Sequence, residues 1–158
     1  MGDKPPEYKI SAIRDGTVID HIPAERTFDV VDILNLRAHP DVISLGMNLK
    51  SKQLGKKGIV KIAGRELTKE EVDEIAIIAP KATINIIKGF SVVKKEPVAI
   101  PDHISDIIKC PNPNCITNRQ AMKTLFHVTE KDPLSVSCHY CERIAVSSEI
   151  LLKYRHGS

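Results

Sequence analysis

Four cysteines constrain the fold of this 158-residue chain more than any other feature. Cys110 and Cys115 enclose four residues, Cys138 and Cys141 enclose two, and 22 residues separate the pairs. Two close pairs joined by a segment long enough to fold back are typical of one tetrahedral thiolate site. Turn-forming prolines and asparagines at 111–114 favour a tight loop that presents two sulfurs to one ion. The sequence therefore predicts a metal centre.

Thiolate ligands and tetrahedral geometry favour zinc, with iron as the main competitor. The alternatives are two disulfides, four free buried thiols, or a redox pair at Cys138 and Cys141. Disulfides need an oxidising compartment, and we expect no export. A redox Cys-x-x-Cys normally opens a helix after a strand and needs no distal pair. Because four thiolates leave no open position on the ion, we expect a structural metal without chemistry of its own.

Composition and length predict two small domains in the cytoplasm. The chain is 42% hydrophobic and 27% charged, as in ordinary proteins with a packed core. Its net charge of +3 is small for a nucleic-acid binder. The segment after residue 100 is too short for a large core, and a metal commonly compensates. We therefore expect one domain at residues 1–100 and another at 101–158, and no membrane span.

The first hundred residues predict an α+β fold. Phe28, Val31, Leu34 and Ala38 recur at helical spacing, and Thr68 with Glu71 forms a capping box. The order strand, helix, strand, strand, helix, strand suits a ferredoxin-like antiparallel sheet with two helices on one face. The expected strands are 8–13 continuing to 17–21, 42–49, 58–63, 83–87 and 91–95, the helices are 24–38 and the segment from Thr68 to Pro80, and 50–57 is a loop or hairpin.

The remaining segment predicts a small antiparallel β domain around the metal. A proline-marked linker covers 96–101. Short apolar runs predict strands at 104–108, 125–128, 134–136 and 144–146. Residues 147–154 are expected to form a short terminal helix.

Lysines and one acid–imidazole pair are the other candidate functional residues. Lys50, Lys52, Lys56 and Lys57 are interpreted as a solvated face. Lys61 lies inside an apolar strand, where it either faces solvent or binds an anion. Asp20 and His21 are adjacent on an extended chain, so their side chains should diverge and make a poor catalytic dyad. They suit recognition of hydroxyl groups, or they simply cap a strand end.

No nucleophile motif, glycine-rich phosphate loop or catalytic metal motif occurs in the sequence. Any phosphate group would have to be held by side chains and isolated amides. The sequence therefore favours a binding module over an enzyme.

Three stretches resemble the regulatory chain of aspartate carbamoyltransferase. They are residues 15–24 (DGTVIDHIPA), residues 79–85 (APKATIN) and the cysteine pairs within CPNPNCIT and CHYCE. The resemblance runs through nearly the whole chain in the expected order. It implies a non-catalytic chain with an N-terminal nucleotide-binding domain and a C-terminal zinc domain that contacts the catalytic chain.

The resemblance also implies partners and effectors. Regulatory chains of this family pair into homodimers that join two catalytic trimers, which gives six catalytic and six regulatory chains. CTP, often aided by UTP, inhibits the catalytic chains, and ATP activates them. No nucleic acid or membrane is implied.

By position, the resemblance implies a set of nucleotide-contacting residues. Main-chain groups of Ser11, Ala12 and Ile13 would read the base. Asp20, His21 and Lys61 match positions that hold the ribose and nearby phosphate, and Asn85, Val92 and Lys95 match those around the triphosphate. Ser11 replaces an acid, and Phe90, beside the base, replaces a tyrosine of a well-known member.

Two other functions compete with the regulatory chain. A zinc-ribbon protein that binds nucleic acid would need a basic, aromatic surface around the cysteines. Residues 101–158 carry a nearly balanced charge and only Phe126, Tyr140 and Tyr154 as aromatic residues, which disfavours this alternative. A redox enzyme that uses Cys138 and Cys141 is the other, and a zinc measurement separates it from a structural site.

Overall fold

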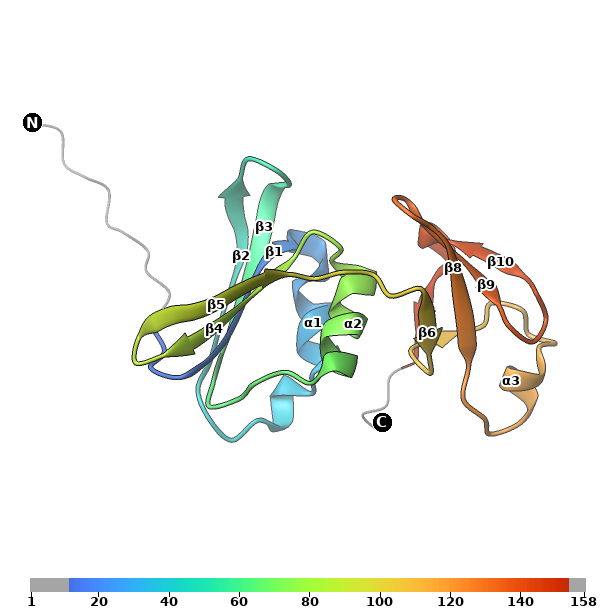
Figure 1. Ribbon diagram of the computed structural model, residues 1–158, viewed down its shortest axis with the longest axis horizontal. Coiled ribbons are helices and arrows are strands. Elements are labelled where there is room, and N and C mark those ends of the chain that lie inside the picture. Colours follow the sequence, from blue (N-terminus) through green and yellow to red (C-terminus); the bar gives the residue numbers. More distant parts are fainter. Residues whose placement is uncertain (1–11, 154–158) are drawn as a thin grey trace, which may run out of the picture.

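The computed structural model describes residues 12–153, which form two β-sheet lobes in sequence order (Figure 1). The first lobe holds a five-stranded antiparallel sheet in the order β2-β3-β1-β4-β5. Its strands are β1 (Gly16–Pro23), β2 (Ile43–Ser51), β3 (Gly55–Ala63), β4 (Thr83–Lys88) and β5 (Ser91–Pro97). The helices α1 (Thr27–Ile33) and α2 (Lys69–Ile78) cover one face of this sheet (Figure 1).

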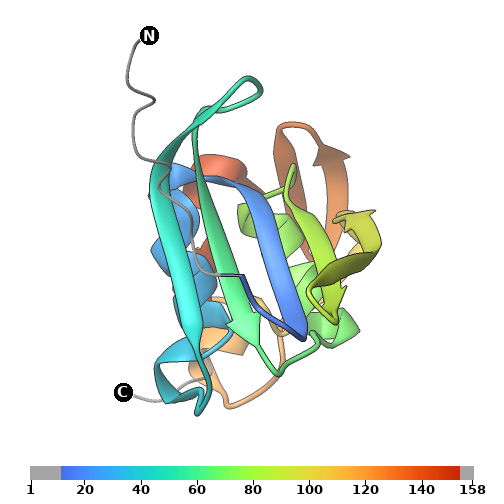
Figure 2. The ribbon, with the colours of Figure 1, turned by 90° about the vertical axis from the view of Figure 1, so that its left-hand side faces the viewer.

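This arrangement confirms the predicted α+β class. β1 pairs with β3 and β4, which lie on either side of it, so the β1-α1-β2 unit is split by β3. β5, which corresponds to the strand expected at 91–95, extends the sheet beyond β4. The sheet is therefore covered by helices on one face and open on the other, and Figure 2 looks onto the open face.

The single helix expected at 24–38 is wrong. The segment forms a 3-10 turn η1 (Ala24–Arg26), then α1, then a second 3-10 turn η2 (Leu36–Ala38). Asn35 adopts a left-handed conformation with φ 51°, which ends the helical hydrogen bonding, and asparagine tolerates this conformation better than most residues. Val31 and Leu34 are buried as expected, whereas Phe28 within α1 and Ala38 beyond the break are exposed.

The strands of the first lobe are longer than expected at the β2–β3 connection. β2 continues to Ser51 and β3 begins at Gly55, so residues 50–57 form the arms of a hairpin and not an open loop. Residues 8–11 of the strand expected at 8–13 lie outside the described residues. Ala12 and Ile13 are not part of a strand.

The second lobe contains a four-stranded antiparallel sheet in the order β10-β9-β8-β6. Its strands are β6 (His103–Ser105), β8 (Leu125–Lys131), β9 (Leu134–Cys138) and β10 (Ile144–Val146). A two-stranded ladder pairs β7 (Ile108–Lys109) with β11 (Leu151–Leu152), and α3 (Ile116–Arg119) is a single turn. This is the small antiparallel β unit that the sequence predicted.

Two expectations for the second lobe are wrong. The strand expected at 104–108 is interrupted at Asp106, where φ is 57°, so it divides into β6 and β7. The helix expected at 147–154 is a 3-10 turn η3 (Ser147–Glu149) followed by β11. Leu151 pairs with Lys109, and Leu152 pairs with Ile108. The backbone groups of this segment are therefore satisfied by β7, and a helix would break that pairing.

One continuous core joins the two lobes. Ile19, Val60 and Ile75 are completely buried between the sheet and the helices. The same cluster continues through Ile100 and Ile104 to Phe126 in the second lobe. Apolar side chains from both sheets therefore belong to one packed cluster. No helix of the described residues is long and apolar enough to cross a membrane.

The predicted capping box at the start of α2 is present. The Glu71 amide donates to the Thr68 hydroxyl at 3.2 Å, and the Thr68 amide donates to the Glu71 carboxylate at 3.0 Å. We predict that Thr68→Ala lowers the free energy of unfolding by about 1 kcal/mol, because the Glu71 amide loses its hydroxyl acceptor. Urea unfolding measures this loss. Thr68→Ser keeps the hydroxyl and is the matched control, so equal stability of the two variants would contradict the prediction.

Candidate functional site

The four cysteines converge on one point in the second lobe. Cys110 follows β7, Cys115 precedes α3, Cys138 ends β9, and Cys141 follows in the next turn. Their sulfurs all lie within 4.8 Å of one another, with 3.6 Å between Cys110 and Cys141 and 3.8 Å between Cys115 and Cys138. A regular tetrahedron with metal–sulfur bonds of about 2.3 Å has sulfurs about 3.8 Å apart. The four residues therefore fit one tetrahedral metal ion.

Hydrogen bonds fix both loops that carry the sulfurs. In the first loop the Cys115 amide donates to the Asn112 carbonyl at 3.0 Å, and the Asn118 side chain donates to the Cys110 and Asn112 carbonyls at 2.8 and 2.7 Å. In the second, the Glu142 amide donates to the Cys138 carbonyl at 2.9 Å. The Thr117 hydroxyl donates to the Cys115 sulfur at 3.2 Å. These hydrogen bonds help to orient the four sulfurs toward one point.

No disulfide joins the four cysteines, which are all free. Burial raises the pKa of Cys110 to about 12, and the neighbouring thiols act in the same direction. Burial also opposes ionisation of Cys141, but hydrogen bonds from the Arg143 backbone and the Asn112 side chain lower its pKa to about 7. Four thiolates this close need a cation, and a metal must displace the protons that the buried thiols hold.

Strand pairing places the second group of candidate residues on the open face of the five-stranded sheet, the face that Figure 2 looks onto. Lys61 of β3 and Asn85 of β4 both pair with Val18 of β1, and Lys95 of β5 pairs with Asn85. Directly paired residues point to the same face of a sheet, so these side chains form one row across four strands. The sequence positions 61, 85 and 95 are thus brought together by strand pairing.

An apolar patch adjoins this row on the same face. Ile13, Val18 and Ile87 are buried against one another, with Ile59 and Ala63 packed beside them. The face therefore offers an apolar surface next to basic and amide side chains. This combination can accept a flat apolar group joined to an anionic one.

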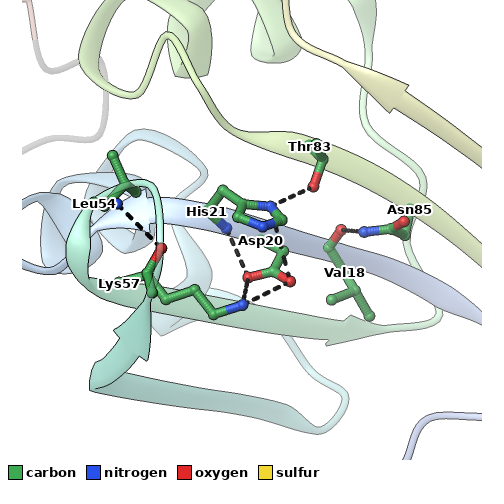
Figure 3. Close-up of polar contacts among 8 residues, drawn as sticks. Val18, Asp20, His21, Leu54, Lys57, Thr83 and Asn85 are labelled. Carbon is green, nitrogen blue, oxygen red and sulfur yellow. Dashed lines mark hydrogen bonds and ion pairs between the residues drawn. The ribbon is translucent and has the colours of Figure 1, made fainter.

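The prediction that Asp20 and His21 diverge is wrong. His21 adopts φ 59° within a β-bulge of β1, and both Ile19 and Ile22 point into the core. The bulge breaks the alternation of the strand, so Asp20 and His21 both lie outside the core. The His21 amide donates to the Asp20 carboxylate at 2.7 Å, and His21 Nδ1 lies 3.2 Å from the Thr83 hydroxyl (Figure 3).

Lys57 joins this pair and was assigned by sequence reasoning to a solvated face. Its ammonium lies 2.9 Å from one carboxylate oxygen of Asp20 and 3.1 Å from the other (Figure 3). Burial of Asp20 opposes its charged form, but the hydrogen bond from Lys57 and that from the His21 amide together lower the pKa of Asp20. The antiparallel pairing of β1 with β3 is the signal that could have placed Lys57 near Asp20.

The remaining predicted residues lie around the β4–β5 turn and the start of the described chain. Phe90 is 67% exposed in the turn, with φ 65°, and its amide donates to the Arg14 carbonyl at 2.9 Å. Val92 pairs with Ile87 at the edge of the apolar patch. Ala12 is exposed and Ile13 belongs to the patch. Ser11 lies outside the described residues.

The fold is that of a small α+β chain with a four-cysteine metal site in the second lobe and an uncovered sheet face in the first. Residues 8–99 match the allosteric domain of the aspartate carbamoyltransferase regulatory chain, and residues 102–151 match its metal binding domain. The regulatory chain of Pyrococcus horikoshii is 51% identical over 148 residues, which cover 92% of this chain and 97% of the relative. That of Bacteroides fragilis is 47% identical over 143 residues, or 90% and 94% of the two chains.

The chain therefore belongs to the family of aspartate carbamoyltransferase regulatory chains. The regulatory chain of Bacteroides thetaiotaomicron, 45% identical over 152 residues, covers 96% of this chain and 99% of its own length. The resemblance noted from the sequence is confirmed on both lobes. A zinc ribbon that binds nucleic acid and a redox enzyme are set aside on this ground.

The ion pair between Lys57 and Asp20 has a measurable effect on ionisation. We predict that Lys57→Met raises the pKa of Asp20, because burial then acts without the ammonium that opposes it. In the parent protein the lowered pKa means that ionised Asp20 stabilises the fold above its unfolded pKa of about 3.9. This contribution is lost as the pH falls through the folded pKa.

A carboxyl NMR titration of Asp20 measures the effect. Lys52→Met is the matched control, because Lys52 is exposed in the same hairpin and has no ion pair with Asp20. An unchanged or lowered pKa of Asp20 in Lys57→Met would show that the ion pair is absent in solution.

Proposed function

We propose that this chain is a non-catalytic regulatory subunit that binds nucleotides on the open face of its first sheet. CTP and UTP act there as inhibitors and ATP as an activator of aspartate carbamoyltransferase, in pyrimidine biosynthesis. The single observation that carries the proposal is the row of Lys61, Asn85 and Lys95 beside an apolar patch, in a chain whose family match spans both lobes.

Each part of a nucleotide has a counterpart on this face. The base would lie on the apolar patch, with main-chain groups of Ser11, Ala12 and Ile13 reading its edge and Phe90 alongside. Asp20 and His21 would accept or donate hydrogen bonds at the ribose hydroxyls. The phosphates would contact the row and Val92 at its edge. Lys95 has no ion-pair partner among residues 12–153, whereas Lys94 is paired with Glu96 at 3.1 Å.

Zinc is the metal proposed for the four-thiolate centre. Cys110, Cys115, Cys138 and Cys141 would supply four thiolates, and a closed tetrahedral set of this kind suits zinc. The ion would neutralise the thiolates and hold both loops together. It would leave no coordination position for a substrate, which agrees with a chain that has no catalytic activity of its own.

The two lobes would divide the work of regulation. Residues 1–100 would bind the nucleotide, and residues 101–158 would contact the catalytic chain. Regulatory homodimers would join catalytic trimers into an assembly of six catalytic and six regulatory chains in the cytoplasm, without nucleic acid or membrane. The continuous core between the lobes supports this proposal, because a shift in one sheet reaches the other through packed side chains.

We predict that Lys95→Ala weakens CTP and ATP alike by about ten- to a hundredfold, since a hydrogen bond to a charged group contributes about 1.5–3 kcal/mol. Asp20→Ala should also weaken both nucleotides, through the shared ribose. Calorimetric titration of CTP and ATP measures these affinities. The rate of the assembled enzyme without effectors should change little, because the chemistry belongs to another chain.

Lys52→Ala is the control for these titrations, since it removes one exposed lysine from the β2–β3 turn, outside the proposed site. Its affinity for both nucleotides should equal that of the parent. Equal affinities for the parent and Lys95→Ala would place the phosphate site elsewhere on the chain.

Metal removal tests the role assigned to the second lobe. We predict that chelation of the thiolate-bound ion releases catalytic trimers from the assembly, while the separated regulatory chain still binds CTP. Sedimentation velocity follows the release, and metal analysis should find one zinc per chain. Loss of CTP binding from an intact assembly would reverse the roles proposed for the lobes.

A further inference from the structure

Three histidines form a continuous row on the second lobe, and one of them lies in the loop that carries Cys138 and Cys141. His103 opens β6, His127 lies in β8, and His139 follows the end of β9. His103 Nδ1 lies 3.0 Å from His127 Nδ1, and His127 Nε2 lies 2.9 Å from His139 Nδ1. We name these three residues the histidine row. The central imidazole therefore contacts a neighbour through each of its nitrogens.

Strand pairing places the histidine row on one face of the sheet. His103 is directly paired with His127 across β6 and β8, which lie side by side in Figure 1. The His139 amide donates to the Leu125 carbonyl at 2.9 Å, which holds His139 beside the start of β8. His103 and His139 are exposed, whereas the preceding Cys138 is buried. The row thus faces solvent, and the sulfur of Cys138 points inward.

The imidazole nitrogens of the histidine row face one another as metal ligands do, with a hydrogen bond at each position where an ion would bind. Each nitrogen–nitrogen hydrogen bond needs one unprotonated nitrogen as its acceptor, and an unprotonated imidazole nitrogen is the group that binds a metal. No ion pair of the described residues involves these three side chains. The ring of Tyr140 packs edge-on against His139, with centroids 5.1 Å apart, and limits the orientations of that imidazole.

The nitrogen separations match adjacent ligands on one ion. Two nitrogens bonded at about 2.05 Å and at right angles lie about 2.9 Å apart. The separations in the histidine row are 2.9 and 3.0 Å. An ion on such a right-angled pair lies beside the nitrogen–nitrogen line, so each ring must turn by about 45° to aim its lone pair at the ion. The outer rings are exposed, which leaves them room to turn.

We propose that the histidine row is a second metal site, which takes a divalent transition ion of the imidazole-preferring class, Zn²⁺, Ni²⁺ or Cu²⁺. His127 is the shared ligand, one of its neighbours is the second, and water completes the coordination. The ion takes the place of one nitrogen–nitrogen hydrogen bond, and the donating imidazole stays neutral because its proton moves to the other nitrogen of the same ring. With two protein ligands and open positions, the site exchanges its ion, in contrast to the closed four-thiolate centre.

An ion at this site connects segments that lie far apart in the sequence. His103 is in the first strand after the connection from the first lobe, and His139 lies in the loop that carries Cys138 and Cys141. Coordination through His127 therefore fastens β6, or the second cysteine loop, to β8. By mass action the bound ion stabilises the second lobe in proportion to its occupancy.

Nickel titration of the full chain, with its thiolate-bound metal in place, tests the proposal. The background is His156→Ala, which removes a histidine outside the described residues. In imidazole NMR spectra, Ni²⁺ should broaden the signals of His103, His127 and His139 first. The signals of His21 and His39 serve as internal controls, because their nitrogens contact Thr83 and the Ala63 carbonyl.

His127→Gln on the same background should weaken Ni²⁺ binding by about tenfold or more in calorimetry, while the content of thiolate-bound metal is unchanged. Equal Ni²⁺ affinity in this variant, or broadening spread evenly over all histidines, would overturn the proposal. If His127→Gln loses its thiolate-bound metal, the test rests on the His156→Ala protein, in which the order of Ni²⁺ broadening among the histidine signals supports or overturns the proposal.

Discussion

The meeting of four sulfurs within 4.8 Å is the constraint on which the second lobe depends. The four-stranded sheet, a two-stranded ladder and one helical turn bury a small set of large side chains, chiefly Ile104, Ile108, Phe126 and Val136. Two loops far apart in the sequence supply two sulfurs each, and they remain together only if a cation balances the thiolates or protons neutralise them. Because Cys110, Cys115 and Cys138 also belong to the continuous core, the metal centre supports the packing that joins the second lobe to the first.

In the first lobe, strand pairing brings together residues that are distant in the sequence, without a metal. Lys61, Asn85 and Lys95 come from three strands, and the register of those strands alone sets them in one row. The bulge in β1 then brings Asp20 and His21 to the edge of the same face, where Lys57 neutralises the carboxylate. The helices occupy the opposite face, so the candidate binding surface is left open by the same topology that builds the core.

Sequence patterns predicted the features that depend on neighbouring residues or on chemical type. The cysteine pairs, the capping box at Thr68 and most strands follow from local spacing and were confirmed. The break at Asn35 and the bulge at His21 were missed. Each depends on a single residue in the left-handed conformation, and no glycine or turn motif in the sequence indicates that conformation at either position. β11 was mistaken for a helix because its partner β7 lies some 40 residues earlier, beyond the reach of local periodicity. The nucleotide contacts inferred from the family resemblance remain predictions, and Lys57 emerged only from the paired strands.

Amide hydrogen exchange before and after removal of the thiolate-bound metal tests the central account most directly. Without the cation, the two cysteine loops and strands β8 and β9 should lose their protection, because their closure depends on the four-thiolate centre. Strands β1, β3 and β4 should remain protected, since their pairing and the packing of α1 and α2 do not require the ion. Unchanged protection of β8 and β9 in the metal-free chain would contradict the account.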